Sequence, residues 1–330
     1  MDRRAASSKS RNALVPLLAL GAIGGCASLR GPAAIELVDT PFFAQSAHQC
    51  GPAALATVLV ASGVNTTPDA LAPDVMLPQR RGSLALELTA RARQSDRLPY
   101  QVDRDASAIV EQLQAGRAVL VLLNLGLKWI PRWHFAVVVG FDRSSSAWVL
   151  RSGRIRRSVM RNRVFMHAWN LADRYALVML RPGELPPRPD SGRLLSLGAD
   201  FESLGRFAVA ERTYDSLATI DPDNSLVWFA LGNARLQLGD NAGAGLAYRR
   251  ALQHDRDNPL YLNNLAHLQM RLGCMTLARA SIERAQASAT DILLREALSR
   301  SAAELEARAR DTAGTPASQC HDADITTDPQ

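Results

Sequence analysis

The sequence predicts an α+β domain followed by an all-α domain of helical repeats. Three observations support this prediction. In the first half of the chain, helical patterns come before strand patterns. Residues 181–190 are rich in proline, and the residues beyond them repeat with a spacing of 34. A length of 330 residues is typical of a chain with two domains.

The first 25 residues have the features of an export signal. Basic residues precede an apolar run over 13–23, which is shorter than the ~20 residues that a membrane-spanning helix needs. The run leads into Ile23-Gly24-Gly25-Cys26, which resembles the lipobox of bacterial lipoproteins except that Ile stands where Leu is usual. The resemblance implies that residues 1–25 are removed and that Cys26 is acylated. An ordinary cleaved signal beside an unrelated cysteine is the alternative.

The lipobox also predicts a location. Residues 26–35 would be a tether between the lipid and the first domain. Ser28 stands at the second mature position, where an Asp would retain a lipoprotein at the inner membrane. We therefore expect a lipid anchor in the bacterial cell envelope, at the outer membrane and facing the periplasm.

Cys50 lies at the predicted start of a helix. Gly51-Pro52 precedes an Ala-Ala-Leu run, and proline is tolerated in the first turn of a helix but not in its interior. Unpaired N–H groups and the helix dipole favour an anion there, and the thiolate is the nucleophilic form of cysteine. Alone, this pattern fits either a reactive thiol or a buried cysteine at a helix start.

His134 opens the apolar run Phe135–Val139, which predicts a buried strand. A histidine in that place can act as the base for a thiol brought close to it in space. Gln45 precedes Cys50 by five residues, and its amide could donate to an oxyanion. Gln, then Cys at a helix start, then His opening a strand is the order of a papain-like thiol site.

These motifs resemble the bacteriocin-processing (double-glycine) peptidase-like family, a branch of the papain-like cysteine peptidases. The resemblance covers residues 36–182 and implies a papain-like domain with its cleft between a helical layer and an antiparallel sheet. It also implies that Cys50 is the nucleophile, that His134 is the general base and that Gln45 is the oxyanion donor. One subgroup of the family joins this domain to a lipoprotein signal and C-terminal tetratricopeptide repeats.

The sequence departs from the family at the third catalytic position. The family has an Asp on the strand after the His strand, which orients the imidazole. Here Ser152 or Arg151 takes that position, and neither is a carboxylate. Ser152 could accept a hydrogen bond from His134 without stabilising its charge, and Arg151 would oppose that charge. Asp142 and Asn170 are possible substitutes that the sequence cannot place.

The remaining pattern of this domain gives helices first and strands afterwards, as in an α+β fold. Trp129 and Trp133 flank the loop 126–132, and they either line the substrate groove or pack under the loop. We expect helices over 52–62, 83–94 (with Ser83 as N-cap) and 106–115, and strands over 118–123, 134–141, 147–150, 157–159 and 175–180.

Residues 183–193 form a predicted proline-rich linker that is extended and semi-rigid. Residues 194–310 then show the tetratricopeptide pattern, with a capping helix over 293–309, and residues 311–330 form a disordered tail. Small residues at fixed places let paired helices approach closely, and a glycine marks the turn between them. The matching columns are Leu197, Leu231 and Leu265; Gly198, Gly232 and Ala266; Gly205, Gly239 and Gly273; Ala210, Ala244 and Ala278; and Tyr214, Tyr248 and Ile282.

Composition narrows the functional classes. The formal charge of +6 comes almost entirely from arginine, without a recognition helix or a stacking platform, so we expect no nucleic-acid partner. No cysteine spacing is typical of a metal site, so we expect no metal or cofactor. Cys274 and Cys320 either pair in an oxidising compartment or are two unrelated thiols. The arginine cluster 151–163 is either a solvated strand face or a subsite for acidic substrates.

Two functions fit these features. The first is a membrane-anchored cysteine peptidase that acts on a peptide or protein substrate and docks a protein partner through its repeats. The second is a catalytically silent peptide-binding lipoprotein that acts through the repeats. The missing Asp favours the second function. The joint presence of Gln45, Cys50 and His134 favours the first, because a scaffold needs none of them at those positions.

Overall fold

The computed structural model describes residues 33–45, 49–77, 82–311 and 320. The predicted signal over 1–25 and the predicted acylation site Cys26 lie outside the described residues, as does most of the predicted tail. Among the described residues, no helix is both long and apolar enough to span a membrane.

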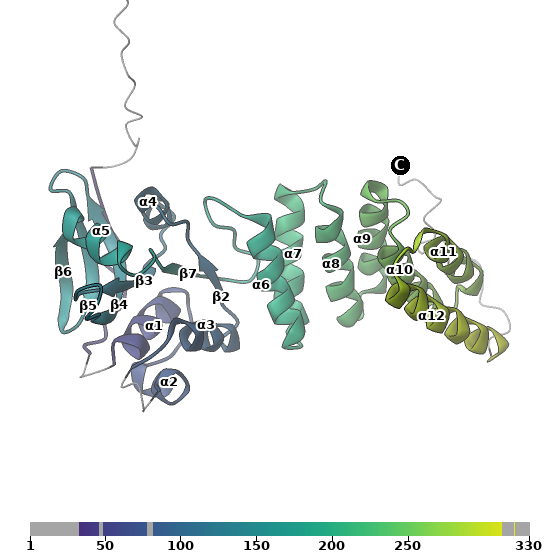
Figure 1. Ribbon diagram of the computed structural model, residues 1–330, viewed down its shortest axis with the longest axis horizontal. Helices are drawn as coiled ribbons and strands as arrows, with labels where there is room; N and C mark the ends of the chain where they lie inside the picture. Colours follow the sequence, from purple (N-terminus) through teal and green to yellow (C-terminus); the bar gives the residue numbers. More distant parts are fainter. Residues whose placement is uncertain (1–32, 46–48, 78–81, 312–319, 321–330) are drawn as a thin grey trace, which may run out of the picture. The chain divides into compact units, whose positions relative to one another are not determined.

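The first domain is built on a seven-stranded sheet in which every pair of neighbouring strands is antiparallel (Figure 1). The strand order is β2-β7-β3-β4-β5-β6, and β1 pairs with β4 outside that path. The strands are β1 (Ala34–Glu36), β2 (Leu98–Gln101), β3 (Val119–Asn124), β4 (Trp133–Asp142), β5 (Ala147–Ser152), β6 (Ile155–Arg161) and β7 (Ala176–Leu180).

Helices cover both faces of this sheet, whereas the sequence predicted one helical layer. Figure 1 shows α4 and α5 on one side of the strands and α1 to α3 on the other. Side chains of β4 alternate between two cores, with Val138 on the α4–α5 side and Val137 on the α1 side. This explains the continuous apolar run of β4, because a strand buried on both faces needs apolar residues at every position. The helices are α1 (Cys50–Ala61), α2 (Pro68–Val75), α3 (Ala85–Gln94), α4 (Ala106–Gln114) and α5 (Asn162–Asn170).

Three helices differ from the sequence prediction: α3 begins at another residue, and α2 and α5 were not predicted. Ser83 is not the N-cap of α3; Leu84 takes that position, and the Ser83 hydroxyl lies 3.7 Å from the sulfur of Met76. Helix α2 was not predicted, although its signals are present. Thr67 accepts a hydrogen bond from the Ala70 N–H, and Pro68 occupies the first turn.

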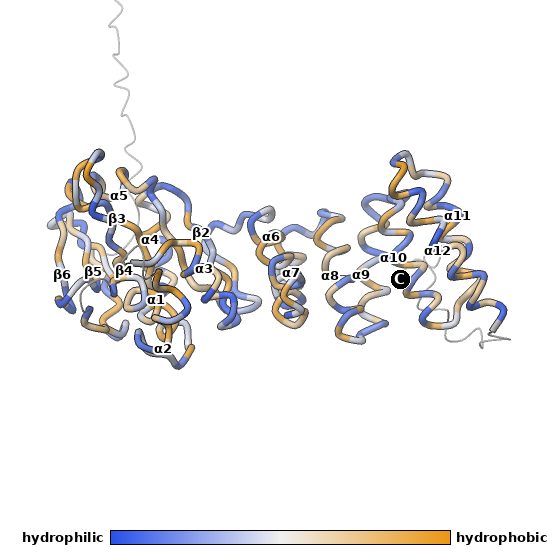
Figure 2. Tube along the Cα trace, turned by 60° about the horizontal axis from the view of Figure 1, so that its bottom comes forward, coloured by the Kyte–Doolittle hydropathy of each residue, from blue (hydrophilic) through white to orange (hydrophobic). Residues whose placement is uncertain are grey.

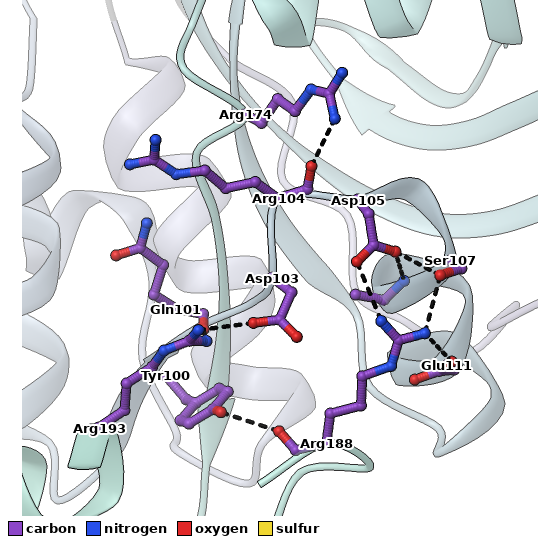
Figure 3. Close-up of polar contacts among 11 residues, drawn as sticks. Tyr100, Gln101, Asp103, Arg104, Asp105, Ser107, Glu111, Arg174, Arg188 and Arg193 are labelled. Carbon is purple, nitrogen blue, oxygen red and sulfur yellow. Dashed lines mark hydrogen bonds and ion pairs between the residues drawn. The ribbon is translucent and has the colours of Figure 1, made fainter. Parts of the chain in front are cut away.

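The proline-rich linker is fastened to the first domain by polar contacts (Figure 3). The Tyr100 hydroxyl donates to the carbonyl of Arg188 at 3.0 Å. The guanidinium of Arg188 binds Asp105 at 3.1 Å and Glu111 at 2.5 Å. These contacts tie the linker at Arg188 to β2 and α4. They restrict the linker more than its prolines alone would.

The second domain consists of three helix pairs and a final helix. The helices of this domain carry both apolar and polar residues (Figure 2), and their buried apolar residues pack against neighbouring helices. The helices are α6 (Ser191–Ser203), α7 (Phe207–Ile220), α8 (Ser225–Gln237), α9 (Asn241–His254), α10 (Pro259–Arg271), α11 (Met275–Ser288) and α12 (Ile292–Asp311).

Glycine recurs at two positions of the repeats for two different structural reasons. Gly205, Gly239 and Gly273 have φ between 69° and 84°, a left-handed conformation in which glycine is favoured at the turn between paired helices. Gly232 instead faces the Tyr248 ring, and a Cβ there would lie 2.5 Å from a ring carbon. The third repeat replaces this pair with Ala266 and Ile282, so a smaller partner leaves room for the methyl group.

Cys274 and Cys320 form a disulfide, with 5.5 Å between their Cα atoms. The sequence had left open whether these two cysteines pair. The bond ties residue 320 of the tail to the N-cap of α11. Among the described residues, Cys50 is the free cysteine.

Candidate active site

Cys50 is the first residue of α1, as the sequence predicted. Gln49 precedes it as N-cap without a side-chain capping bond, and Pro52 lies in the first turn. The Cys50 side chain is partly buried against the core between α1 and the sheet, which includes Phe135, the chain neighbour of His134. The thiol therefore lies beside a helix N-terminus, where backbone N–H groups and the helix dipole favour negative charge.

Gly51 is required by packing at this helix start. A Cβ on Gly51 would overlap the hydroxyl and Cβ of Ser83, and it would lie 3.6 Å from a methyl carbon of Leu88. Ser83 follows the short bridge between Leu77 and Gly82. The glycine after Cys50 thus lets this segment pack against the first turn of α1.

His134 is the second residue of β4 and pairs with Leu123 of β3. Its Nε2 atom lies 2.8 Å from the hydroxyl oxygen of Ser152 on β5. In the antiparallel register Val137 faces Arg151, so Ser152 is a diagonal neighbour of His134 and within reach of its ring. Burial lowers the pKa of His134 from its ordinary value of 6.5 and favours the neutral imidazole.

A hydrogen bond between Nε2 and Ser152 leaves the other ring nitrogen of His134 available for proton transfer. When Nε2 carries the proton and donates to Ser152, Nδ1 has a free lone pair. A neutral hydroxyl can fix this tautomer and the ring orientation. It cannot supply the negative charge that would stabilise an imidazolium.

Gln45 is placed beside the turn that follows Ser152. Its backbone N–H donates to the carbonyl of Gly153 at 3.0 Å, and its side chain is partly exposed. Gly153 has a φ of 59°, a conformation that glycine adopts without strain. One backbone bond therefore connects the segment carrying Gln45 to the strand end that carries Ser152.

Arg151 does not face His134, contrary to the possibility that it takes the family's Asp position. It is 4% exposed, and its guanidinium donates to the carbonyls of Thr40, Val38, Leu37 and Arg156. Adjacent residues of a strand point to opposite faces, so Arg151 and Ser152 diverge. Arg151 is also not part of the solvated arginine face that the sequence suggested.

The two substitutes for the missing Asp are engaged elsewhere. Asp142 accepts hydrogen bonds from Ser144 and Ser145 in an exposed turn, and the Ser144 and Ser145 hydroxyls lower its pKa to about 2. Asn170 is exposed and accepts from the Arg174 guanidinium at 2.6 Å. Of Arg151, Ser152, Asp142 and Asn170, it is Ser152 whose side chain lies within hydrogen-bond distance of His134.

The loop before His134 projects its apolar side chains outward. Trp129 is 76% exposed and Trp133 is 54% exposed, so these rings do not pack under the loop. Asn124 holds the loop by accepting from the N–H groups of Gly126 and Arg132, each at 2.9 Å. Both rings are therefore accessible to solvent.

No pattern in the sequence indicates what Arg151 does. A buried arginine without a carboxylate partner usually needs several backbone carbonyls as acceptors, but their location depends on the path of residues 37–40 across the sheet. Residues 37–45 show no strand or helix periodicity. In the fold, the carbonyls of residues 37, 38 and 40 lie beside Arg151 of β5.

Comparisons with known proteins agree with this architecture. Residues 37–176 match the model of the Peptidase_C39 like family, and residues 195–259 and 231–292 match that of the tetratricopeptide repeat. No match was found among curated protein sequences.

Two solved structures are similar to parts of the chain. A C39-like peptidase from Bacillus anthracis is similar with 15% identity, covering 45% of this chain and 98% of that one, at a TM-score of 0.38. The type III secretion chaperone SycD from Yersinia enterocolitica, in complex with a peptide of the translocator YopD, is similar with 22% identity. That match covers 36% of this chain and 92% of SycD, at a TM-score of 0.34. The family models thus divide the chain into a Peptidase_C39-like region and a region of tetratricopeptide repeats.

Proposed function

We propose that this protein is a membrane-anchored cysteine peptidase whose repeats dock a protein partner. The observation that carries the proposal is the hydrogen bond of 2.8 Å between His134 and Ser152. It fixes an imidazole at the start of β4, while Cys50 begins the helix that packs on the same sheet. The family match over residues 37–176 supports the same activity.

The proposed reaction has two halves. The Cys50 sulfur attacks the carbonyl carbon of a peptide bond as His134 takes up the thiol proton. The Gln45 side chain and the backbone N–H of Cys50 donate to the resulting oxyanion. His134 then gives its proton to the leaving amine, and water hydrolyses the thioester to release the acid and the free thiol.

Intact-mass measurement with a peptidyl electrophile tests this proposal. An N-blocked dipeptide chloromethyl ketone should add once to the wild-type protein, and peptide mapping should place the adduct on Cys50. His134→Ala should slow the labelling about a hundredfold or more, because general-base catalysis contributes ~10²–10⁴-fold. Arg104→Met is a matched control, since it changes an exposed side chain outside the arginine cluster. Equal labelling of wild type and His134→Ala would contradict a thiol–imidazole pair.

A peptide-binding lipoprotein without turnover is the second candidate. It is favoured by Ser152 at the position where the family has a carboxylate, because a hydroxyl leaves the imidazolium without a counter-charge. In that case the wild-type protein and Cys50→Ala would retain the same peptides, and neither would cleave them.

The anchor and the location belong to the same proposal. The lipobox-like run ending in Cys26 supports acylation, and the Cys274–Cys320 disulfide supports an oxidising compartment such as the periplasm. Several acyl chains would hold the protein firmly on a membrane. Cys26→Ala should release the protein from washed membranes, whereas Cys320→Ser should leave it bound. Retention of Cys26→Ala would mean that something other than this lipid attaches the chain.

A further inference from the structure

The segment that carries Gln45 is held by a buried cation. Residues 37–45 connect β1 to the oxyanion donor and contain no regular structure. The Arg151 guanidinium donates to three of their carbonyls: that of Val38 at 3.1 Å, that of Thr40 at 3.3 Å and that of Leu37 at 3.5 Å. A fourth bond of 2.8 Å reaches the carbonyl of Arg156 on β6.

These contacts are unusual for a residue this buried. Arg151 is 4% exposed, and no carboxylate of the described residues accepts a hydrogen bond from it. The Glu36 carboxylate attracts this guanidinium but accepts no hydrogen bond from it, and a buried charge is costly unless its hydrogen bonds are satisfied. Here backbone carbonyls of an irregular segment satisfy them, so the segment and the cation depend on one another.

The far end of the segment is fixed by β5 and the turn after it. Gln45 donates its N–H to Gly153, two residues beyond Arg151. At the near end, the Leu37 N–H donates to the carbonyl of Val139 at 2.8 Å. Arg151 binds carbonyls between these two bonds, in addition to the turn bond from the Thr40 N–H to the Leu37 carbonyl and the packing of Phe43 against the core.

We propose that Arg151 is a positioning residue for the oxyanion donor: its guanidinium holds residues 37–40 on the sheet and thereby fixes the backbone that presents Gln45. This inference rests on the proposed function, because it assigns Gln45 the oxyanion role. Lysine would replace the guanidinium poorly, since an ammonium has three donors without the planar fork that reaches several carbonyls at once.

Two reagents separate oxyanion positioning from damage to Cys50 and His134. Acylation of Cys50 by the p-nitrophenyl ester of an N-blocked dipeptide forms a tetrahedral oxyanion before p-nitrophenolate leaves. Alkylation by iodoacetamide displaces iodide directly and forms no oxyanion. Arg151→Met should slow acylation about tenfold to a hundredfold, less than the ~10²–10³ for removing an oxyanion donor outright. Alkylation should stay within about twofold of wild type, and Arg151→Lys should be intermediate in acylation.

A double-mutant cycle tests whether the effect passes through Gln45. With Gln45→Ala already present, Arg151→Met should slow acylation by no more than about twofold, because coupled residues are not additive. Arg104→Met removes the same charge from an exposed position outside the arginine cluster and should leave both rates unchanged. Independent, additive effects of Arg151→Met and Gln45→Ala would overturn the inference, as would equal losses in acylation and alkylation.

Amide hydrogen exchange keeps the inference testable if the proposed function fails. If the ester does not acylate wild-type Cys50 at all, the peptidase proposal is refuted, but the segment can still be observed. Arg151→Met should then speed exchange at the amides of Leu37 and Gln45 at least about tenfold, while the core strand β3 keeps its protection. Unchanged exchange in a folded Arg151→Met protein would overturn the inference. If that variant does not fold, Arg151→Lys gives the same comparison.

Discussion

The Ser152 hydroxyl lies 2.8 Å from Nε2 of His134. We expect this position to correspond to that of the Asp in the peptidase family. The position of the orienting group is therefore occupied, but by a neutral side chain. A neutral hydrogen bond contributes about 0.5–1.5 kcal/mol, and bonds to charged groups are roughly twice as strong. The Ser152 hydroxyl can orient the imidazole as a carboxylate would. Unlike a carboxylate, it carries no charge to stabilise the protonated ring.

Replacing Ser152 should therefore have graded effects. Ser152→Ala should lower the rate of Cys50 labelling or peptide cleavage by less than about tenfold, or roughly 1.4 kcal/mol of barrier. Ser152→Asp should raise the rate, and Arg151 is not placed to capture the new charge because its guanidinium binds backbone carbonyls. Loss of activity in Ser152→Ala with Cys50 still reactive would give Ser152 a direct chemical role. Asp142→Ala and Asn170→Ala are controls that should change nothing.

The pH dependence of kcat/KM should reflect the burial of His134. Burial lowers its pKa below the ordinary 6.5, so the imidazole stays a competent base to lower pH than a free histidine. We expect the acid limb of the profile to lie below pH 6.5 in the wild type and to move to higher pH in Ser152→Asp, where a carboxylate favours the charged ring. A wild-type limb at or above 6.5 would contradict the burial of this group.

The same shift has a consequence for folding stability. Below pH 6.5 the unfolded chain binds a proton at this residue that the folded chain resists, so the folded state loses stability as the pH falls. Above that value neither state is protonated there and His134 contributes no pH dependence. Urea unfolding of wild type and His134→Gln between pH 5 and pH 8 should show a smaller pH dependence in the variant.

The glycine and tyrosine pair of the second repeat should resist enlargement. Gly232→Ala places a methyl group 2.5 Å from a ring carbon of Tyr248, and overpacking of this kind costs typically about 1–3 kcal/mol. Gly192→Ala is the matched control in the first repeat helix, because its nearest contact would be an Asp190 oxygen at 3.4 Å. Chemical denaturation should show a lower free energy of unfolding for Gly232→Ala and nearly the wild-type value for Gly192→Ala. Equal stability of both variants would mean that the Tyr248 ring moves aside without destabilising the fold.

The disulfide should stabilise the end of the repeats. It links residues 46 positions apart, for which the chain-entropy model gives about 4 kcal/mol. Cys320→Ser should therefore unfold at lower urea than the oxidised wild type. A reducing agent should lower the wild-type midpoint to that of the variant and leave the variant unchanged. Identical midpoints for oxidised wild type and Cys320→Ser would show that the bond does not constrain the unfolded chain.

Much of the fold could be predicted because its signals are local. The strand after His134 is apolar at every position, and the columns with a spacing of 34 place glycine at each turn between paired helices. Helix α2 was missed even though Thr67 and Pro68 mark its start, because it is short and contains an internal proline, Pro73. Strand β2 was missed because Pro99 interrupts its pattern, although both of its neighbours are buried.

The candidate site could be predicted only in part, because its contacts join distant segments. The motif around Cys50 and the strand of His134 are readable in the sequence, and so is the absence of an Asp. The choice between Ser152 and Arg151 depends on which face of β5 each one occupies. That choice needs the register of β4 against β5, which includes a bulge between Val138 and Gly140. No local pattern predicts where the Arg151 acceptors lie.

Cleavage of a peptide mixture tests the central claim most directly. The full-length protein and its Cys50→Ala variant would each be incubated with a proteome-derived peptide library, and new peptide termini would be identified by mass spectrometry. The peptidase account predicts new termini with the wild type and none with Cys50→Ala, and strongly reduced cleavage with His134→Ala. Retention of the same peptides by wild type and Cys50→Ala, without new termini from either, would contradict catalysis and assign the protein to peptide binding.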